Sequence, residues 1–400
     1  MKVPPPSPST WRRAAVRAAI GLAALAWLGG CTTFHRPPRR TSLDSAQTVL
    51  KASLVSNFLV IEAQWDKHGP YHFLIDTGSS TTLVTPELAK RYGGRARAGQ
   101  SPVRVMGANG QVKLLPPVLL RRIELGEARF EGVQALIHDL NDLSDHLGIR
   151  IDGVLGFPLF RGILLTLDYP RSEVILTPYG VPTAMPGVTI PFNNDQNTPL
   201  IPIQLGAESF IALIDSGSDT ALSLNTVGLH PGFKYGPRPG ALVATLSGDR
   251  IRMMGRLGQS LTIGTYVIEN PIADVTDELS SIGGGLLRNF IVTFDQKRKQ
   301  VTFYRPNYDV IQVPPLRSTG LSFTKSVAYW KVAAVVAGSP AEMLGVQAGD
   351  LCSRINDEPV SAWPFARYSD LVRSAKRVTY TFINGNEEQK VTLPVFELVP

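Results

Sequence analysis

Residues 73–83 read Phe-Leu-Ile-Asp-Thr-Gly-Ser-Ser-Thr-Thr-Leu, and residues 212–222 read Ala-Leu-Ile-Asp-Ser-Gly-Ser-Asp-Thr-Ala-Leu. In both copies an apolar triplet precedes an aspartate, a small hydroxyl residue, a glycine and a serine. The two aspartates, Asp76 and Asp215, are 139 residues apart. An internal repeat at this spacing indicates two similar structural units that follow one another in the chain.

A second pair of matching segments extends the repeat. Residues 155–160 parallel residues 282–287, so that an apolar-Gly element follows each aspartate motif. Short apolar runs bounded by Gly, Pro, Asn or Asp occur throughout both units, and such runs are typical of strands. We therefore expect two duplicated lobes, mainly β, over residues 50–180 and 181–314.

Each aspartate motif places a carboxylate at the end of a strand. Gly78 and Gly217 remove side-chain bulk at the turn, so that two such loops can approach each other closely. Two carboxylates held a few ångströms apart cannot both ionise easily, so they share one proton and titrate as a coupled pair. The ionised member can take a proton from a bound water while the protonated member donates to a scissile carbonyl oxygen. Asp76 and Asp215 are therefore the candidate catalytic residues; structural turns in a duplicated β fold are the other interpretation.

The hydroxyl residues beside the aspartates suggest supporting roles. Thr77 and Ser216 have hydroxyls that can bond across to the opposite loop and brace the pair. Ser79 and Ser218 can donate hydrogen bonds to the outer carboxylate oxygens, which stabilises the ionised form and lowers its pKa. We therefore expect activity at acidic to mildly acidic pH.

These motifs resemble those of the aspartic proteases of the pepsin and retropepsin group. Residues 154–156 and 281–283 occupy the place of the apolar-apolar-Gly element behind each catalytic loop, although Ser281 departs from the pattern. The resemblance covers roughly residues 50–308 and implies a bilobal pepsin-like fold with a peptide cleft between the lobes. Both aspartates belong to one chain, so the implied site is complete in a monomer.

The same family closes its cleft with a hairpin flap. The candidates are residues 103–115, with Asn109-Gly110 as the hairpin turn, and residues 243–253, with Gly248 at the turn. Ordinary sheet edges would give the same pattern. Asp219 stands where the first copy has Ser80, and it places a third acid near the pair without a function that the sequence explains.

A different pattern follows residue 314. Residues 338–341 read Gly-Ser-Pro-Ala and residues 345–350 read Gly-Val-Gln-Ala-Gly-Asp. This resembles a PDZ domain, an α+β fold, over residues 315–400. The resemblance implies binding of peptide or protein C-termini, with the carboxylate held by the loop Gly320, Leu321, Ser322 and Phe323, in which Ser322 replaces the usual second glycine. A structural module that docks on the protease lobes is the alternative.

The formal net charge of +7 comes from the N-terminal segment. The seven basic residues of residues 1–40 have no acidic counterpart there, so the chain from residue 41 onward is formally neutral. A nucleic-acid binder carries its basic charge on the folded domain. We therefore expect no nucleic-acid partner.

A targeting signal is expected at the N-terminus. Arginines precede the apolar run 18–28, whose 11 residues are too few to cross a bilayer core of about 30 Å but are typical of a signal peptide. The run leads into Leu-Gly-Gly-Cys, which resembles a bacterial lipobox. This implies a signal peptide over residues 1–30, lipid on Cys31 and a flexible tether over residues 31–49; a plain signal peptide or an uncleaved anchor are the alternatives. We expect a lipid-anchored protein on the periplasmic side of the bacterial cell envelope, where Thr32 favours the outer membrane over the inner.

Other chemistries lack their motifs. The six histidines form no HExxH or paired-ligand spacing, and no glycine-rich phosphate loop follows a strand. We expect no metal and no cofactor. The expected function is that of a membrane-tethered aspartic endopeptidase acting on peptides or proteins, and the alternative is a non-hydrolytic peptide-binding lipoprotein scaffold that keeps the protease fold.

Overall fold

The structure, a computed structural model, describes residues 36–94, 101–106, 112–181, 186–245, 248–307, 309–326, 328–385 and 387–400. The predicted signal peptide and Cys31 lie outside the described residues. Residues 37–400 form one unit. Strands account for 53% of the structure and helices for 12%, which confirms the mainly β fold class.

The first large sheet has 13 strands and contains the first copy of the repeat together with strands from the second. Its members are β1 (Arg40–Leu43), β2 (Thr48–Val55), β3 (Phe58–Trp65), β4 (His68–Asp76), β5 (Thr82–Val84), β8 (Pro117–Leu125), β9 (Ala128–Ile137), β10 (Gly153–Gly156), β11 (Ile163–Asp168), β12 (Glu173–Pro178), β13 (Val188–Pro191), β23 (Ile291–Asp295) and β24 (Gln300–Tyr304).

The second large sheet has ten strands and contains most of the second copy. Its members are β14 (Leu200–Leu205), β15 (Glu208–Asp215), β16 (Leu222–Leu224), β17 (Phe233–Thr245), β18 (Gly248–Leu257), β19 (Leu261–Ile263), β20 (Tyr266–Glu269), β21 (Ile272–Val275), β22 (Ser281–Gly283) and β25 (Ile311–Gln312).

Strand pairing repeats between the two copies. In the first, β4 pairs antiparallel with β3 and parallel with β10, while β5 pairs antiparallel with β10 and parallel with β9. In the second, β15 pairs antiparallel with β14 and parallel with β22, while β16 pairs antiparallel with β22 and parallel with β21. The internal repeat of the sequence therefore corresponds to a structural duplication.

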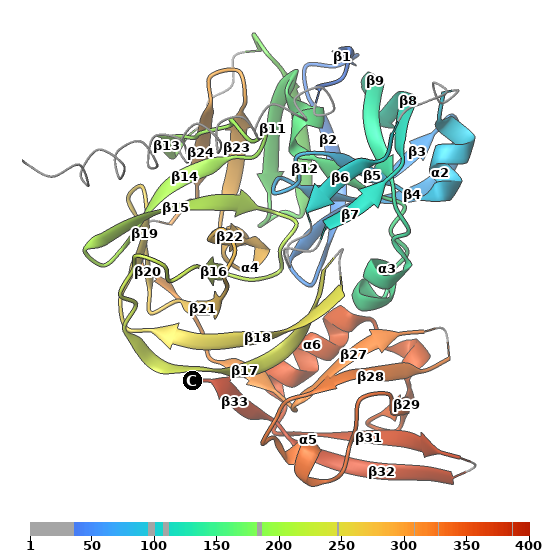
Figure 1. The fold of residues 1–400 in the computed structure, drawn as a ribbon, viewed down its shortest axis with the longest axis vertical. Coiled ribbons are helices and arrows are strands. Elements are labelled where there is room, and N and C mark those ends of the chain that lie inside the picture. Colours follow the sequence, from blue (N-terminus) through green and yellow to red (C-terminus); the bar gives the residue numbers. More distant parts are fainter. Residues whose placement is uncertain are drawn as a thin grey trace, which may run out of the picture. The chain divides into compact units, whose positions relative to one another are not determined.

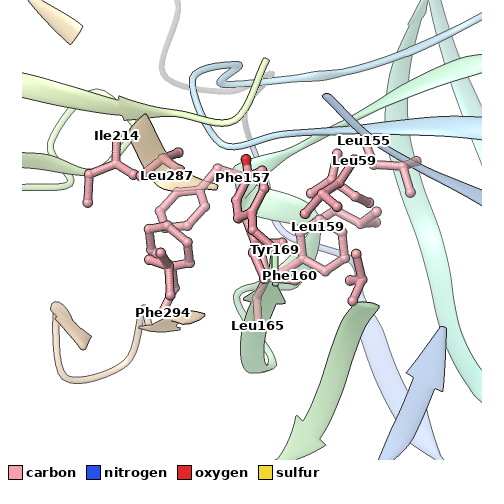
Figure 2. Packing of buried hydrophobic residues seen from close by; sticks show 14 of the residues in the cluster. Leu59, Leu155, Phe157, Leu159, Phe160, Leu165, Tyr169, Ile214, Leu287 and Phe294 are labelled. Carbon is pink, nitrogen blue, oxygen red and sulfur yellow. The ribbon is translucent and has the colours of Figure 1, made fainter. Parts of the chain in front are cut away.

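The two copies share a sheet and a core. Figure 1 shows β11, from the first copy, beside β23, from the second, and the two strands pair antiparallel. Between the copies, the rings of Phe157 and Phe294 meet edge to face with their centroids 5.3 Å apart, a favourable aromatic geometry. Figure 2 shows both rings in one buried cluster, which also includes Ile214 from the strand that carries Asp215. The shared core fixes the two aspartate-bearing strands relative to each other.

Short helices lie between the strands. Those of the duplicated region are α2 (Pro86–Tyr92), α3 (Asn141–Leu147), the 3-10 helix η1 (Phe157–Phe160) and α4 (Gly284–Leu287). The start of α2 follows from its sequence, because the Thr85 side chain accepts a hydrogen bond from the N–H of Leu88 and Pro86 occupies the first turn.

The C-terminal module has its own sheet and core. Its elements are β26 (Leu316–Ser318), β27 (Leu321–Lys325), β28 (Trp330–Val335), α5 (Pro340–Met343), β29 (Leu351–Ile355), β30 (Glu358–Pro359), the 3-10 helix η2 (Val360–Ala362), α6 (Phe365–Ser374), β31 (Arg377–Asn384), β32 (Glu387–Pro394) and β33 (Phe396–Val399).

Arg256 of β18 joins this module to the second lobe. Its guanidinium donates to the carbonyl oxygens of Val313 (3.0 Å) and Pro314 (3.1 Å) in the connecting segment, and also to that of Pro400. Met254 of β18 shares a small apolar cluster with Val399 of the module. The module therefore packs on the second lobe.

The expectation of a flexible tether over residues 31–49 is wrong for its second half. Residues 40–43 form β1, which pairs antiparallel with β9, and β2 already begins at Thr48. The Arg39 N–H also donates to the Glu131 carbonyl oxygen at 2.8 Å. The sequence hides this strand because β1 lies at the sheet edge, where backbone pairing does not require an apolar pattern.

Both candidate flaps contain antiparallel pairs. In the first, β6 (Val103–Met106) pairs with β7 (Val112–Leu115), and in the second, β17 pairs with β18 up to Thr245 and Gly248. The Asn109-Gly110 turn, and residues 246–247 of the second hairpin, lie outside the described residues. The first pair forms a small sheet separate from the large ones.

Candidate active site

Parallel strand pairs place the two aspartates at equivalent positions. Asp76 ends β4 opposite Gly156 of β10, and Asp215 ends β15 opposite Gly283 of β22. A Cβ atom on either glycine would collide with the backbone of the loop that follows the aspartate of its own lobe. The apolar-Gly elements therefore let each catalytic loop fold back over its neighbouring strand, and Ser281 does not disturb this pairing.

The glycines of the two motifs allow the carboxyls to meet. A Cβ atom on Gly78 would collide with the carboxyl of Asp215, and one on Gly217 would collide with that of Asp76. Each loop thus yields space to the aspartate of the opposite lobe. The two carboxyls are close enough to hydrogen-bond to each other.

Four hydrogen bonds brace the two loops. The Thr77 hydroxyl donates to the Ile214 carbonyl oxygen at 2.7 Å and accepts from the Ser216 N–H at 3.0 Å. Reciprocally, the Ser216 hydroxyl donates to the Ile75 carbonyl oxygen at 2.8 Å and accepts from the Thr77 N–H at 3.0 Å. Thr77 and Ser216 are fully buried. This is the bracing across the loops that the duplicated motif predicts.

The expected role of the serine hydroxyls is wrong. The Ser79 hydroxyl donates to the Thr81 carbonyl oxygen at 2.8 Å, and the Ser218 hydroxyl bonds to that of Thr220 at 2.8 Å. Backbone N–H groups serve the carboxylates instead: that of Ser79 reaches Asp76 and that of Gly217 reaches Asp215, both at 2.9 Å. Each hydroxyl instead forms a hydrogen bond within its own loop, as serine side chains often do with nearby groups.

Burial dominates the electrostatics of the pair. It is the largest cause that raises the pKa of Asp76 well above its usual range, and the charge of Asp215 adds to the effect. Burial also raises the pKa of Asp215 to about 6, although hydrogen bonds from the Gly217 N–H and from Asp76 oppose the rise. Both residues keep some exposed surface, so water can reach them. One proton shared by two carboxyls is the expected state near neutral pH.

Two neighbours of the pair escape sequence reasoning. Asn57, in the turn between β2 and β3, donates from its side-chain amide to the Asp219 carbonyl oxygen at 2.9 Å and so links the lobes. Tyr169 is buried just after β11, where burial and then the charges of Asp215 and Asp76 raise the pKa of its phenol. Figure 2 shows Tyr169 among Phe157, Phe160 and Leu165. Neither residue stands in a motif, so no local signal could have identified it.

The candidate peptide loop of the C-terminal module opens β27. Gly320 has φ +89°, and a Cβ atom there would collide with Ser339. Leu321 and Phe323 point into the module's core, and Ser322 lies opposite Ala334 of β28. At the other end of β27, Gly148 of the first lobe packs against Lys325 and Phe365. This contact shows that the module also docks on the first lobe.

The described residues give two negative findings. Among them, no group of three or more His, Cys, Asp or Glu side chains could hold a metal ion. In the same part of the chain, no helix is long and apolar enough to cross a membrane.

Two family models match the chain. Residues 61–159 match the aspartyl protease family, a segment that includes Asp76 and Gly156. Residues 331–382 match the PDZ domain. Together these matches support an aspartic protease with a C-terminal PDZ domain. No curated protein matches the sequence significantly.

Each match covers only part of its domain. The first match ends before the second lobe. The assignment of Asp215 to the site therefore rests on the internal repeat and on the observed hydrogen bonds between the loops. The second begins after Gly320–Phe323 and leaves the candidate carboxylate loop outside it. A protease domain joined to a peptide-binding domain is the description that both matches support.

The brace between the loops gives a stability prediction. Thr77→Val keeps the side-chain shape but leaves the Ser216 N–H and the Ile214 carbonyl buried without their partner. We expect a loss of about 2–4 kcal/mol in the free energy of unfolding, measured by urea denaturation. Thr379→Val, which removes an exposed hydroxyl bonded to that of Thr392, is the control and should change it by less than about 0.5 kcal/mol. Equal small changes in both variants would contradict the role of the brace.

Proposed function

We propose that this protein is a membrane-tethered aspartic endopeptidase that hydrolyses peptide bonds with Asp76, Asp215 and an activated water. The observation that carries the proposal is the pair of carboxyls that each lie against the glycine of the opposite motif, fixed by reciprocal bonds between two buried hydroxyls and the opposite loops. A single carboxyl in a turn would need neither the brace nor the two glycines that make room for the pair.

The two carboxyls have complementary roles. Burial raises the pKa of both, and their coupling keeps one proton on the pair. The ionised carboxyl takes a proton from the water, whose oxygen attacks the carbonyl carbon, while the protonated carboxyl donates its proton to the carbonyl oxygen. The tetrahedral intermediate then collapses. The carboxyl that took the water's proton gives it to the nitrogen as the C–N bond breaks, and a hydroxyl of the intermediate returns its proton to the other carboxyl, so that the pair is singly protonated again.

The PDZ domain supplies a second peptide site in this proposal. A peptide or protein C-terminus would add a strand beside β27, with its carboxylate at the Gly320–Phe323 loop. The packing of Gly148 against Lys325 and Phe365 brings the far end of that strand to the first lobe. Binding that is lost when the peptide C-terminus is amidated would support this site, and equal binding of both peptides would contradict it.

A non-hydrolytic peptide-binding scaffold is the alternative function. Asp219 beside the pair and Ser281 in the second repeat are the features that favour it. The hydrogen-bonded carboxyls and the regular pairing of Ser281 with Leu213 support hydrolysis instead. Peptide binding without turnover by the wild-type protein would establish the alternative.

Digestion of a peptide library tests the catalytic pair. Asp76→Asn and Asp215→Asn should each lower kcat by at least about a thousandfold, because one removes the acid and the other the base. Asp195→Asn, at an exposed carboxyl in the second lobe, is the matched control and should retain activity. A folded Asp76→Asn or Asp215→Asn variant with substantial turnover would contradict the proposal.

The pH dependence follows from the raised pKa of Asp215. Below about pH 6 both carboxyls are protonated and no base remains, so kcat/KM should rise as pH increases through this value. This moves the optimum upward from the acidic range expected from the serine hydroxyls. The midpoint of the acid limb in a plot of kcat/KM against pH measures this pKa. A midpoint near the ordinary carboxyl pKa of 3.8 would contradict the burial argument.

Lipid on Cys31 would hold the protease close to the bacterial outer membrane, on its periplasmic side. The eight Cα-to-Cα steps from Cys31 to Arg39 span at most about 28 Å, and Arg39 is already bound to β9. Cys31→Ser should therefore move the protein from the membrane fraction to the soluble fraction, with peptide hydrolysis retained. Cys352→Ser is the control and should leave the protein in the membrane fraction. Membrane retention of Cys31→Ser would argue for an uncleaved anchor.

A further inference from the structure

Asp219 has a specific partner in the structure. It follows the second catalytic motif, and its carboxylate forms a hydrogen-bonded ion pair with the guanidinium of Arg252. Arg252 belongs to β18, in the candidate second flap, and only 8% of its surface is exposed. A charged side chain this deeply buried requires counter-charges to offset its desolvation.

A second acid lies on the other side of the guanidinium. Asp274 of β21 is 1% exposed, and its Oδ2 lies 3.9 Å from Nε of Arg252. The strand β21 pairs with β18 and also with β16, which follows the catalytic loop, so that Asp274 stands opposite Ser223. Arg252 thus links the hairpin to the loop that carries Asp219 and to β21, the strand that pairs with β16.

The backbone at Asp219 is held from the first lobe. Its carbonyl oxygen accepts the 2.9 Å bond from the Asn57 amide, and Gly284 gives Asn57 the space that a side chain would fill. The loop that carries the Asp219 carboxylate, four residues after Asp215, is therefore held in place from the first lobe. An unbalanced charge on Asp219 would act on the nearby Asp215.

The charges around Asp215 are unequal in the two lobes. Asp76 shares its proton with Asp215, the phenol of Tyr169 is neutral, and Asp219 adds a negative charge that raises the pKa of Asp215. The first lobe has Ser80 at the equivalent position. Arg252 forms an ion pair with Asp219, and Asp274 is its second counter-ion.

We propose that Arg252 is a positioning residue for the catalytic pair: its guanidinium neutralises Asp219 and ties β18 to the second catalytic loop, so that the charge of Asp219 does not act unopposed on Asp215. The inference rests on the proposed hydrolysis by Asp76 and Asp215. It gives the third acid of the second repeat a role, as the attachment point of the hairpin.

The pH profile of kcat/KM distinguishes this role from a purely structural one. With a peptide cleaved by the wild type, Arg252→Met should move the acid limb upward by about half a pH unit or more, because Asp219 loses its counter-charge. Asp219→Asn should move the limb downward. The double variant should lose the upward displacement, and Arg252→Lys, which keeps the charge, should restore most of the wild-type limb.

Controls separate the possible failures. Arg367→Met removes an arginine that pairs with Glu358 in the PDZ domain, and it should leave the limb unchanged. If Arg252→Met does not fold, as judged by its thermal transition, the position of the acid limb in Asp219→Asn tests the proposal. Hydrolysis with an unmoved limb in the folded variants would overturn the role of Arg252, whereas absence of hydrolysis by the wild type would overturn the proposed function and this inference with it.

Discussion

The Thr77 and Ser216 hydroxyls each donate to one backbone group of the opposite lobe and accept from another. Because all four bonds are buried, breaking the brace would leave buried backbone groups without partners. The brace makes the two aspartate strands one rigid part. The glycines that admit the opposite carboxyl, and the proton that the carboxyls share, depend on that fixed separation.

Desolvation and hydrogen bonding act in opposite directions on the pair, and desolvation is the larger effect. Backbone N–H groups lower the pKa of each carboxyl, yet both pKa values remain raised. An added negative charge at Asp219 would work against ionisation of Asp215 unless a cation balanced it. The Arg252 guanidinium supplies that balance from a strand of the neighbouring hairpin, which couples the charge of the site to the position of β18.

The segments at both ends of the two lobes are attached to them by hydrogen bonds. Arg256 binds the segment before the PDZ domain and the last residue of the chain, while Gly148 meets the domain from the first lobe. At the other end, β1 attaches residues 40–43 to β9. The composition of the segment before the PDZ domain and of residues 40–43 is also compatible with free linkers. In the structure, guanidinium hydrogen bonds hold the first to the lobes and backbone hydrogen bonds hold the second.

The sequence by itself determined the duplication, the mainly β class and the identity of the paired aspartates, because residues 73–83 and 212–222 encode strand, turn and close approach locally. It also identified Thr77 and Ser216 as braces, since their spacing from the aspartates is the same in both copies. Only the tertiary structure decided the partners of Ser79, Ser218 and Asp219, and the edge strand β1. Those outcomes depend on which acceptor or charge lies nearest in space, and Arg252 and Asn57 come from segments far from the motif in sequence.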